Sequence, residues 1–455
     1  MRKPRTRKRL WAALLAVLCL FSLTGCDTLF TGDAEALMRP PRPTGDKAGI
    51  HELLEKAAGE NFTFKYPASG DYRSAIIMYD LTGDGAEEAV ALYQSANAST
   101  GVNIMFIQKQ GGVWGSMGSF LTTATQVDKV MFGDVNSDGL PEVVVGWGSS
   151  QSGTSNISVY SQSGGKMTET VLDQGYSQLL VMDFDGDGCE EIFTASVTVG
   201  EQPGMARLFR LRNGAIEIVG SCPIDSAVTS IVNAVGGLLS ANQTGVMLDG
   251  SKTANTFVTE VIYWDEELEA LVSPFYDPLT QTVEATSRSL NVASKDINGD
   301  KIIELPMVNL LPGAPAQNAP DTSYITDWHR YDTETNTLVR VMSMVTNSSD
   351  NYWFLIPDMW KNQITTEQDV STRSLVFRRW ISQEETNLAE GRLGERLLEI
   401  RAFTVKQWDA AQEEGYFKIL DSNNLVYAGK ILSPESELAM TENDVKNSFK
   451  LITQE

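Results

Sequence analysis

The chain has 455 residues, of which 42% are hydrophobic, and its 36 basic and 59 acidic residues give a net charge of −23. So large an apolar share can form packed cores, which excludes wholesale disorder, and the length predicts two or three domains. A surface this acidic repels the phosphates of nucleic acids, so we expect no nucleic-acid partner.

The first 25 residues have the pattern of a secretion signal. A basic segment, residues 1–9, precedes an apolar run over residues 10–23 that is too short to span a bilayer, which needs about 20 residues. The run ends in Leu-Thr-Gly-Cys, which resembles the bacterial lipobox. That resemblance implies cleavage before Cys26, a lipid with palmitate-type acyl chains on Cys26, and an extracytoplasmic protein anchored to the bacterial cell membrane.

Residues 26–49 are polar and proline-rich, which predicts a flexible tether, and residues 50–60 predict a short helix. An acidic pattern then recurs four times in a strand-rich region. It reads DLTGDGAEE from Asp80, DVNSDGLPE from Asp134, DFDGDGCEE from Asp183 and DINGDKIIE from Asp296. The last interval is about twice the others, so a degenerate copy without the acidic loop is expected at 236–250.

Each acidic segment lies between strand-like runs, such as QLLVM before the third copy and IFTASVTV after it. Repeated units of three or four short strands predict the blades of a β-propeller, because blades packed in a ring bury one another's faces. We therefore expect a mainly β protein, with a β-propeller of about five, or up to about seven, blades over residues 50–345. A β-sandwich pair and an open array of sheets are the alternatives.

The acidic segments place oxygen-bearing side chains at positions 1, 3, 5 and 9 of a tight loop, which suits calcium because it takes about six to eight hard oxygen ligands. Glycine at position 6 of the first three loops allows the positive φ that the turn requires. The fourth loop has Lys301 there, for which a positive φ costs about 1 kcal/mol or more. The expected ligands of the first to fourth loops are Asp80, Thr82, Asp84 and Glu88; Asp134, Asn136, Asp138 and Glu142; Asp183, Asp185, Asp187 and Glu191; and Asp296, Asn298, Asp300 and Glu304.

These loops are not EF-hands, because position 12 carries no acid and the flanking segments read as strands. Repeated four times in strand context, the pattern resembles the FG-GAP/VCBS-type repeats of integrin-like β-propellers over residues 62–345. That resemblance implies one structural calcium ion for each loop. An acidic turn that binds no metal is the alternative for each of them.

From residue 346 the pattern changes to mixed strands and helices without an acidic loop, which predicts a separate small α/β domain over residues 346–455. A closing helix is expected after Thr441, with Asp444 forming a partial capping box. Beyond Cys26, the mature chain keeps Cys189 and Cys222, which either pair or remain free thiols.

Motifs of catalysis are missing from the sequence. It has only two histidines, His51 and His329, and no nucleophile elbow, zinc-protease motif or phosphate-binding loop. The leading hypothesis is a cell-surface lipoprotein that acts as a non-catalytic binding or scaffold module with structural calcium sites. It would contact the membrane through its lipid and an envelope protein or a glycan through its body. A surface hydrolase or lyase acting on polysaccharide, and a purely structural envelope protein, are the alternatives.

Overall fold

The computed structural model describes residues 46–59, 61–95, 101–148, 156–313, 323–386, 391–411, 414–422 and 424–452. The expected signal peptide, Cys26 as the expected lipid attachment site, and most of the expected tether lie outside the described residues. The described chain is mainly β. None of its helices is long and apolar enough to cross a membrane.

Five antiparallel sheets follow one another along the chain, and each is built mainly from consecutive strands. The first sheet contains β1 (Thr63–Phe64), β2 (Ile76–Tyr79), β3 (Glu88–Gln94), β4 (Asn103–Gln110) and β5 (Val113–Leu121). The second contains β6 (Gln126–Gly133), β7 (Glu142–Gly148), β8 (Asn156–Ser163) and β9 (Lys166–Leu172). The third contains β10 (Gln178–Met182), β11 (Glu191–Ser196), β12 (Met205–Arg212) and β13 (Ala215–Pro223).

The fourth sheet contains β14 (Ser230–Ser240), β15 (Gln243–Thr253), β16 (Thr256–Asp265) and β17 (Ala270–Val272), and a small hairpin of β18 (Tyr276–Asp277) and β19 (Thr282–Val283) follows it. The fifth contains β20 (Leu305–Leu310), β21 (Tyr324–Asp332), β22 (Thr337–Asn347), β23 (Tyr352–Leu355) and the returning β29 (Phe449–Leu451). The degenerate copy expected at 236–250 lies in β14 and β15, where a tight turn after Ser240 replaces the acidic loop. The strand expected just before the fourth loop forms only a single bridge, between Lys295 and Glu304.

Alternating side chains let one strand contribute to two cores. In β3, Val90 and Leu92 pack into the core shared with the second sheet. Ala89 and Ala91, on the other face, pack against helix α3 (Asp46–Ala58). Further cores lie between the second and third, third and fourth, and fourth and fifth sheets. Because each inner sheet is buried on both faces, its central strands read as continuous apolar runs.

The two ends of this series are covered by other elements. Helix α3 begins at Asp46, ahead of the expected residues 50–60, and buries Ile50, Leu54 and Ala58 on the first sheet, four residues apart along one helix face. At the other end, the fifth sheet shares a core with the C-terminal sheet. Neither terminal sheet therefore presents a bare apolar face.

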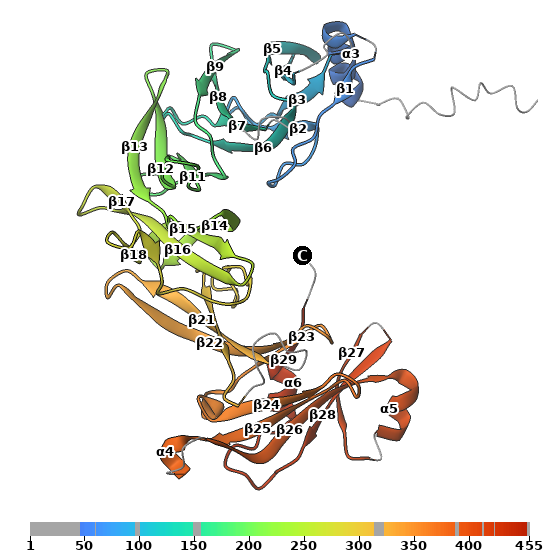
Figure 1. The fold of residues 1–455 in the computed structure, drawn as a ribbon. Helices are drawn as coiled ribbons and strands as arrows, with labels where there is room; N and C mark the ends of the chain where they lie inside the picture. Colours follow the sequence, from blue (N-terminus) through green and yellow to red (C-terminus); the bar gives the residue numbers. More distant parts are fainter. Residues whose placement is uncertain are drawn as a thin grey trace, which may run out of the picture.

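The five sheets follow an open arc, with the first sheet at one end and the C-terminal sheet at the other (Figure 1). The closed ring that we expected is not formed by the described residues, and the arrangement matches the open-array alternative. Its physical reason is the coverage of both terminal faces, because a series capped at each end buries its apolar surface without closing.

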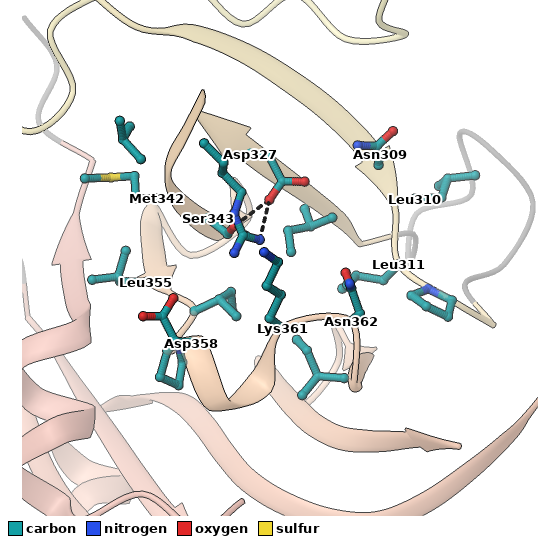
Figure 2. A pocket seen from close by; sticks show the side chains of 17 residues that line it. Asn309, Leu310, Leu311, Asp327, Met342, Ser343, Leu355, Asp358, Lys361 and Asn362 are labelled. Atoms are coloured by element: carbon teal, nitrogen blue, oxygen red, sulfur yellow. Dashed lines mark hydrogen bonds and ion pairs between the residues drawn. The ribbon is translucent and has the colours of Figure 1, made fainter. Parts of the chain in front are cut away.

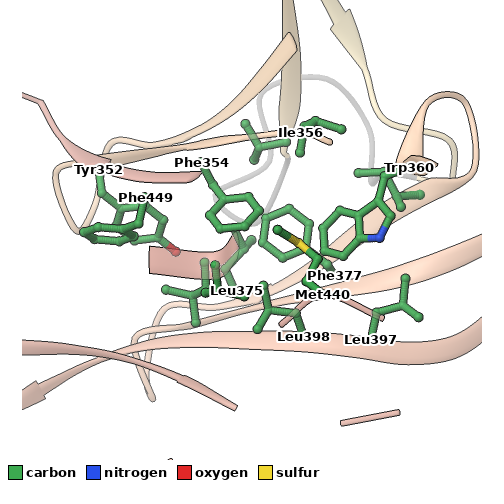
Figure 3. Close-up of a cluster of buried hydrophobic side chains, with 14 of the residues drawn as sticks. Tyr352, Phe354, Ile356, Trp360, Leu375, Phe377, Leu397, Leu398, Met440 and Phe449 are labelled. Carbon is green, nitrogen blue, oxygen red and sulfur yellow. The ribbon is translucent and has the colours of Figure 1, made fainter. Parts of the chain in front are cut away.

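The C-terminal sheet has the order β24 (Ile364–Asp369), β25 (Ser374–Ile381), β26 (Arg392–Thr404), β28 (Leu425–Ile431) and β27 (Phe417–Ser422). The short helices of this region are η1 (Asp358–Trp360), α4 (Gln383–Thr386), α5 (Val405–Ala411) and α6 (Glu442–Ser448). Thr441 and Asp444 form the expected capping box at the start of α6. Phe354, Trp360 and Phe377 pack together in the core that joins this sheet to the fifth (Figure 3).

A buried carboxyl group in the fourth sheet makes stability depend on pH. Glu260 of β16 is 2% exposed, and its Oε1 accepts from the backbone N–H of Asp225 at 3.0 Å. Its Oε2 has no hydrogen-bond partner among the described residues. Burial raises the pKa of Glu260 to about 8 although the Asp225 N–H lowers it, and the Asp225 carboxylate raises it further.

We expect the free energy of unfolding of the wild type to fall by a few kcal/mol relative to that of Glu260→Gln between pH 5 and pH 8. Because the folded pKa lies above the usual value near 4.5, the stability that protonated Glu260 provides is fully present below that value and is lost as the pH rises through about 8. Each pKa unit corresponds to about 1.4 kcal/mol. Urea unfolding at several pH values measures the difference, with Glu201→Gln at an exposed position as control. Parallel pH curves for the wild type and Glu260→Gln would contradict it.

Candidate functional site

The four acidic loops share one backbone scaffold, in which position 1 ties the turn together. The Oδ2 of Asp80 accepts from the N–H of Gly85 at 2.9 Å, and the Oδ2 of Asp296 accepts from the N–H of Lys301 at 2.8 Å. Asp134 and Asp183 make the same contact. Position 6 has a positive φ in every loop, and Lys301, at 73°, adopts the strained conformation expected of it.

Position 9 carries a glutamate that lies almost fully inside the protein. In each loop its Oε2 accepts a backbone N–H from position 2, at 2.8–3.1 Å. The four side chains, Glu88, Glu142, Glu191 and Glu304, are at most 4% exposed. Burial raises the pKa of both Glu142 and Glu304 to about 7, with nearby loop aspartates adding to it. A nearby cation would relieve this cost of burying a carboxylate.

In the second and fourth loops an amide N–H group faces the acids. The Nδ2 of Asn136 donates to Asp138 at 3.1 Å and to Glu142 at 2.5 Å. The Nδ2 of Asn298 makes the corresponding contacts with Asp300 and Glu304, at 3.0 and 3.1 Å. Each amide oxygen accepts the backbone N–H of position 5 at 2.8 Å. A cation bound by position 3 would therefore need the amide to turn and to give up that hydrogen bond.

In the first loop position 3 is Thr82. Its Oγ1 is buried and has no hydrogen-bond partner among the described residues. An orphaned oxygen at an expected ligand position, close to the buried Glu88, is the arrangement that a hard cation would satisfy. The first loop therefore fits calcium as well.

The third loop already contains a positive charge. Asp183, Asp185 and Asp187 place carboxylate oxygens within 4.8 Å of one another, the one such acidic group in the described part of the chain. The Nη2 of Arg210 donates to Asp185 at 3.0 Å and to Asp187 at 2.7 Å, and its Nε donates to Glu191 at 2.6 Å. Although burial acts to lower it, these acids raise the pKa of Arg210 above its usual value. A guanidinium therefore lies among three of the four expected calcium ligands of the third loop.

Strand register explains why Arg210 meets the third loop. Arg210 follows Phe209 on β12, which pairs with Ile192, so Arg210 lies opposite Glu191. The positions that correspond to Arg210 in the first and second sheets are Gln108 and Ser161, which carry no charge. Arg330 takes this position in the fifth sheet, but it is exposed and forms no ion pair within the described ranges.

The loops also lie at the seams between successive sheets. The N–H of Asp134 donates to the carboxylate of Glu190 in the third loop at 2.7 Å, and the Glu190 N–H donates back to the Asp134 carbonyl at 3.0 Å. The hydroxyl of Thr244 in the fourth sheet donates to the carbonyl of Asp183 at 3.0 Å. Stiffening a loop therefore stiffens the contact between two sheets.

A cavity of about 570 Å³ lies between the fifth sheet and the C-terminal sheet. Figure 2 shows Asp327, Ser343 and Lys361 pointing toward one another inside it. The carboxylate of Asp327 accepts a hydrogen bond from Ser343 and lies 3.7 Å from the Nη1 of Arg340. Its partners already hold the carboxylate of Asp327, and the exposed Asp358 is the second carboxylate in the lining.

A second cavity of about 570 Å³ borders the third loop. Six carboxylate side chains and Trp264 line it, together with Arg210 and Arg212. Both oxygens of Glu191 are engaged, by Arg210 and by the backbone N–H of Phe184. The cavity therefore holds several carboxylates that Arg210 does not engage, among them Glu217, Glu266 and Glu269.

The remaining sequence candidates are located as follows. Cys189 and Cys222 are both free thiols. His329 lies on β21, where its Nδ1 is 3.0 Å from the carbonyl oxygen of Asp327, and burial lowers its pKa. Neither histidine lines the cavity of Figure 2 or the one beside the third loop. Arg210 was missed by the sequence analysis, although it is one of two basic residues in the otherwise apolar stretch ARLFRL.

Comparisons with known proteins give no family. No protein-family model and no curated protein matches the chain. Similar solved structures include a rhamnogalacturonan lyase of Bacillus licheniformis, 11% identical over 74% of this chain and 72% of its own, with a TM-score of 0.30. They also include the WD40 domain of SCAP from fission yeast, 12% identical over 70% and 71%, also with a TM-score of 0.30. A protein from Lactobacillus plantarum is 8% identical over 70% and 82%, with a TM-score of 0.29. Scores of this size carry no argument about function.

Proposed function

We propose that this chain is a lipid-anchored, extracytoplasmic binding scaffold without catalytic activity, whose blade-like sheets are stiffened by structural calcium in the first, second and fourth loops. The observation that carries the calcium proposal is the buried glutamate at position 9, which forms no ion pair in these loops among the described residues. Only in the fourth loop does a cationic side chain, that of Arg330, lower the pKa of this glutamate. The series of sheets is covered at both ends, and this supports a rigid body whose surfaces bind a partner.

The residues that would hold the ion are the side chains at positions 1, 3, 5 and 9. Calcium bound there would neutralise the loop carboxylates and hold the turn rigid. Because each of the first two loops packs on the following sheet, a rigid turn fixes the angle between sheets. The third loop reaches the same result with Arg210, so its sheet needs no metal.

The integrin-like resemblance of the loops, the lipobox at Cys26 and the acidic charge support the rest of the proposal. The body would stand off the bacterial membrane on its tether and bind an envelope protein or a glycan, not a nucleic acid. This propeller-type scaffold is an open array, which leaves sheet edges and cavities accessible at its C-terminal end.

Calcium is expected to raise the melting temperature of the protein, and Asp134→Asn is expected to reduce that rise. An ion that binds only the native state stabilises it by about 2.7 kcal/mol at a hundredfold excess over its Kd. Thermal melts in calcium, magnesium and EDTA measure the effect, with exposed Asp173→Asn as the matched control. A melt that calcium leaves unchanged would refute the calcium proposal, and magnesium acting equally well would refute its selectivity.

A surface hydrolase or lyase acting on polysaccharide is the second candidate, favoured by the acidic cavity beside the third loop. Glu217, Glu266 and Glu269 line it and are not held by Arg210. Incubation with soluble polysaccharides, followed by assays for new reducing ends and unsaturated uronates, separates the two candidates. Turnover that Glu217→Gln abolishes would overturn the non-catalytic proposal. A purely structural envelope protein would bind none of these polysaccharides.

A further inference from the structure

The two faces of the fifth sheet border different cavities. Alternation along β21 places Tyr324, Thr326 and Trp328 on one face and Ile325 and Asp327 on the other. The second group lines the cavity of Figure 2, and the first lines a separate cavity of about 750 Å³. Its second wall is residues 290–293 together with Lys295 and Ile297, in the segment that leads into the fourth loop.

Aromatic rings and neutral polar groups share the lining of this larger cavity. Tyr324 and Trp353 are half-buried and present ring surface, while Trp328 is buried beneath. Hydroxyl and amide side chains stand around them, among them those of Ser348 and Gln368. Sugar rings are bound by this combination, because their C–H faces stack on aromatic rings while their hydroxyls form hydrogen bonds.

The charge of the cavity is opposite to that of the protein. The chain has 59 acidic residues against 36 basic ones, yet no carboxylate occurs among the described residues that line this cavity. Lys295 is the single charged side chain in the lining, is exposed, and forms no ion pair within the described ranges. A ligand that brings its own carboxylate would pair with Lys295 and meet no repelling carboxylate in the lining.

We propose that this cavity binds an acidic saccharide, with a sugar ring stacked on Trp353 or Tyr324 and a uronate carboxylate paired with Lys295. The inference rests on the proposed binding role and names the chemical class of its ligand. A neutral glycan would stack equally well but would leave Lys295 without a partner. A cavity of this volume holds a few sugar units, as binding sites of about 300–1,000 Å³ do.

The test is isothermal titration of the whole mature chain with tetragalacturonate and with a hyaluronan hexasaccharide, each compared with its methyl ester. We expect at least one acid to bind with a Kd below about 1 mM, and its uncharged ester to bind roughly tenfold more weakly. Lys295→Gln should weaken the acid by a similar factor and remove the difference between acid and ester. Added salt should weaken only the acid.

Lys166→Gln, an equally exposed lysine on β9, is the control for the change in net charge. Trp353→Phe, which keeps a ring in the sheet, tests stacking and should weaken acid and ester together. Binding that neither Lys295→Gln nor Trp353→Phe alters would place the ligand elsewhere and overturn the proposal, as would no binding by either acid at about 10 mM. The calcium response is measured separately, so its loss would refute the loop assignment and leave this result standing.

Discussion

Replacing Arg210 with glutamine is expected to destabilise the calcium-free protein by about 3 kcal/mol and to give the third loop a calcium site that the wild type lacks. The guanidinium of Arg210 is 14% exposed and contacts Asp185, Asp187 and the almost fully buried Glu191. Removing it leaves the buried Glu191 with only the backbone N–H of Phe184 as a partner, beside three aspartates in one turn. Glutamine is the residue that occupies the corresponding position in the first sheet, at Gln108.

Urea unfolding in EDTA and in calcium measures both effects. In calcium, the Arg210→Gln variant should recover most of its loss, because the ion replaces the guanidinium among the same oxygens. Arg212 is exposed and lies two residues along β12, outside the loop. Arg212→Gln removes the same charge, and it should neither destabilise the protein in EDTA nor add a response to calcium. An Arg210→Gln variant that is destabilised and gains no calcium response would show that Arg210 is an ordinary ion-pair partner.

Trp360→Ala is expected to lower the free energy of unfolding by about 3–5 kcal/mol, the range for truncating a buried aromatic side chain. Trp360 is 0% exposed, its ring centroid lies 5.2 Å from that of Phe377, and its Nε1 donates to the carbonyl of Leu438 at 2.7 Å. This core contains side chains of both the fifth sheet and the C-terminal sheet. Trp360→Ala should therefore destabilise both the fifth sheet and the C-terminal sheet.

Hydrogen exchange locates the effect of the Trp360→Ala variant. Protection should fall together in β22 and β25, since their side chains Val345 and Phe377 share the core, and should persist in β7 of the second sheet. Trp360→Phe keeps most of the ring contact, loses one hydrogen bond and should cost less. Loss confined to the C-terminal sheet would contradict the shared core.

The loops could be predicted from the sequence because their information is local. Oxygen spacing and glycine at position 6 are read within nine residues, and Lys301 at a φ of 73° shows that the turn overrides an unsuitable residue. Short apolar runs likewise located the strands on either side of the first three loops.

The open arc and Arg210 could not be predicted in the same way. Whether a series of sheets closes depends on the angles accumulated at each seam, and on α3 and the C-terminal sheet covering its ends. The partnership of Arg210 and Glu191 joins residues on neighbouring strands, so it depends on a register that the sequence pattern does not specify. The saccharide cavity needs the fold of segments far apart in the chain.

The most direct test of the central claim is a count of bound calcium, by native mass spectrometry of the wild type and of the Arg210→Gln variant side by side. The wild type should hold one ion for each of the first, second and fourth loops, and the variant should hold one more. A wild type that binds no calcium would contradict the scaffold as described. A wild type that fills the third loop as well would show that Arg210 does not take the place of the ion.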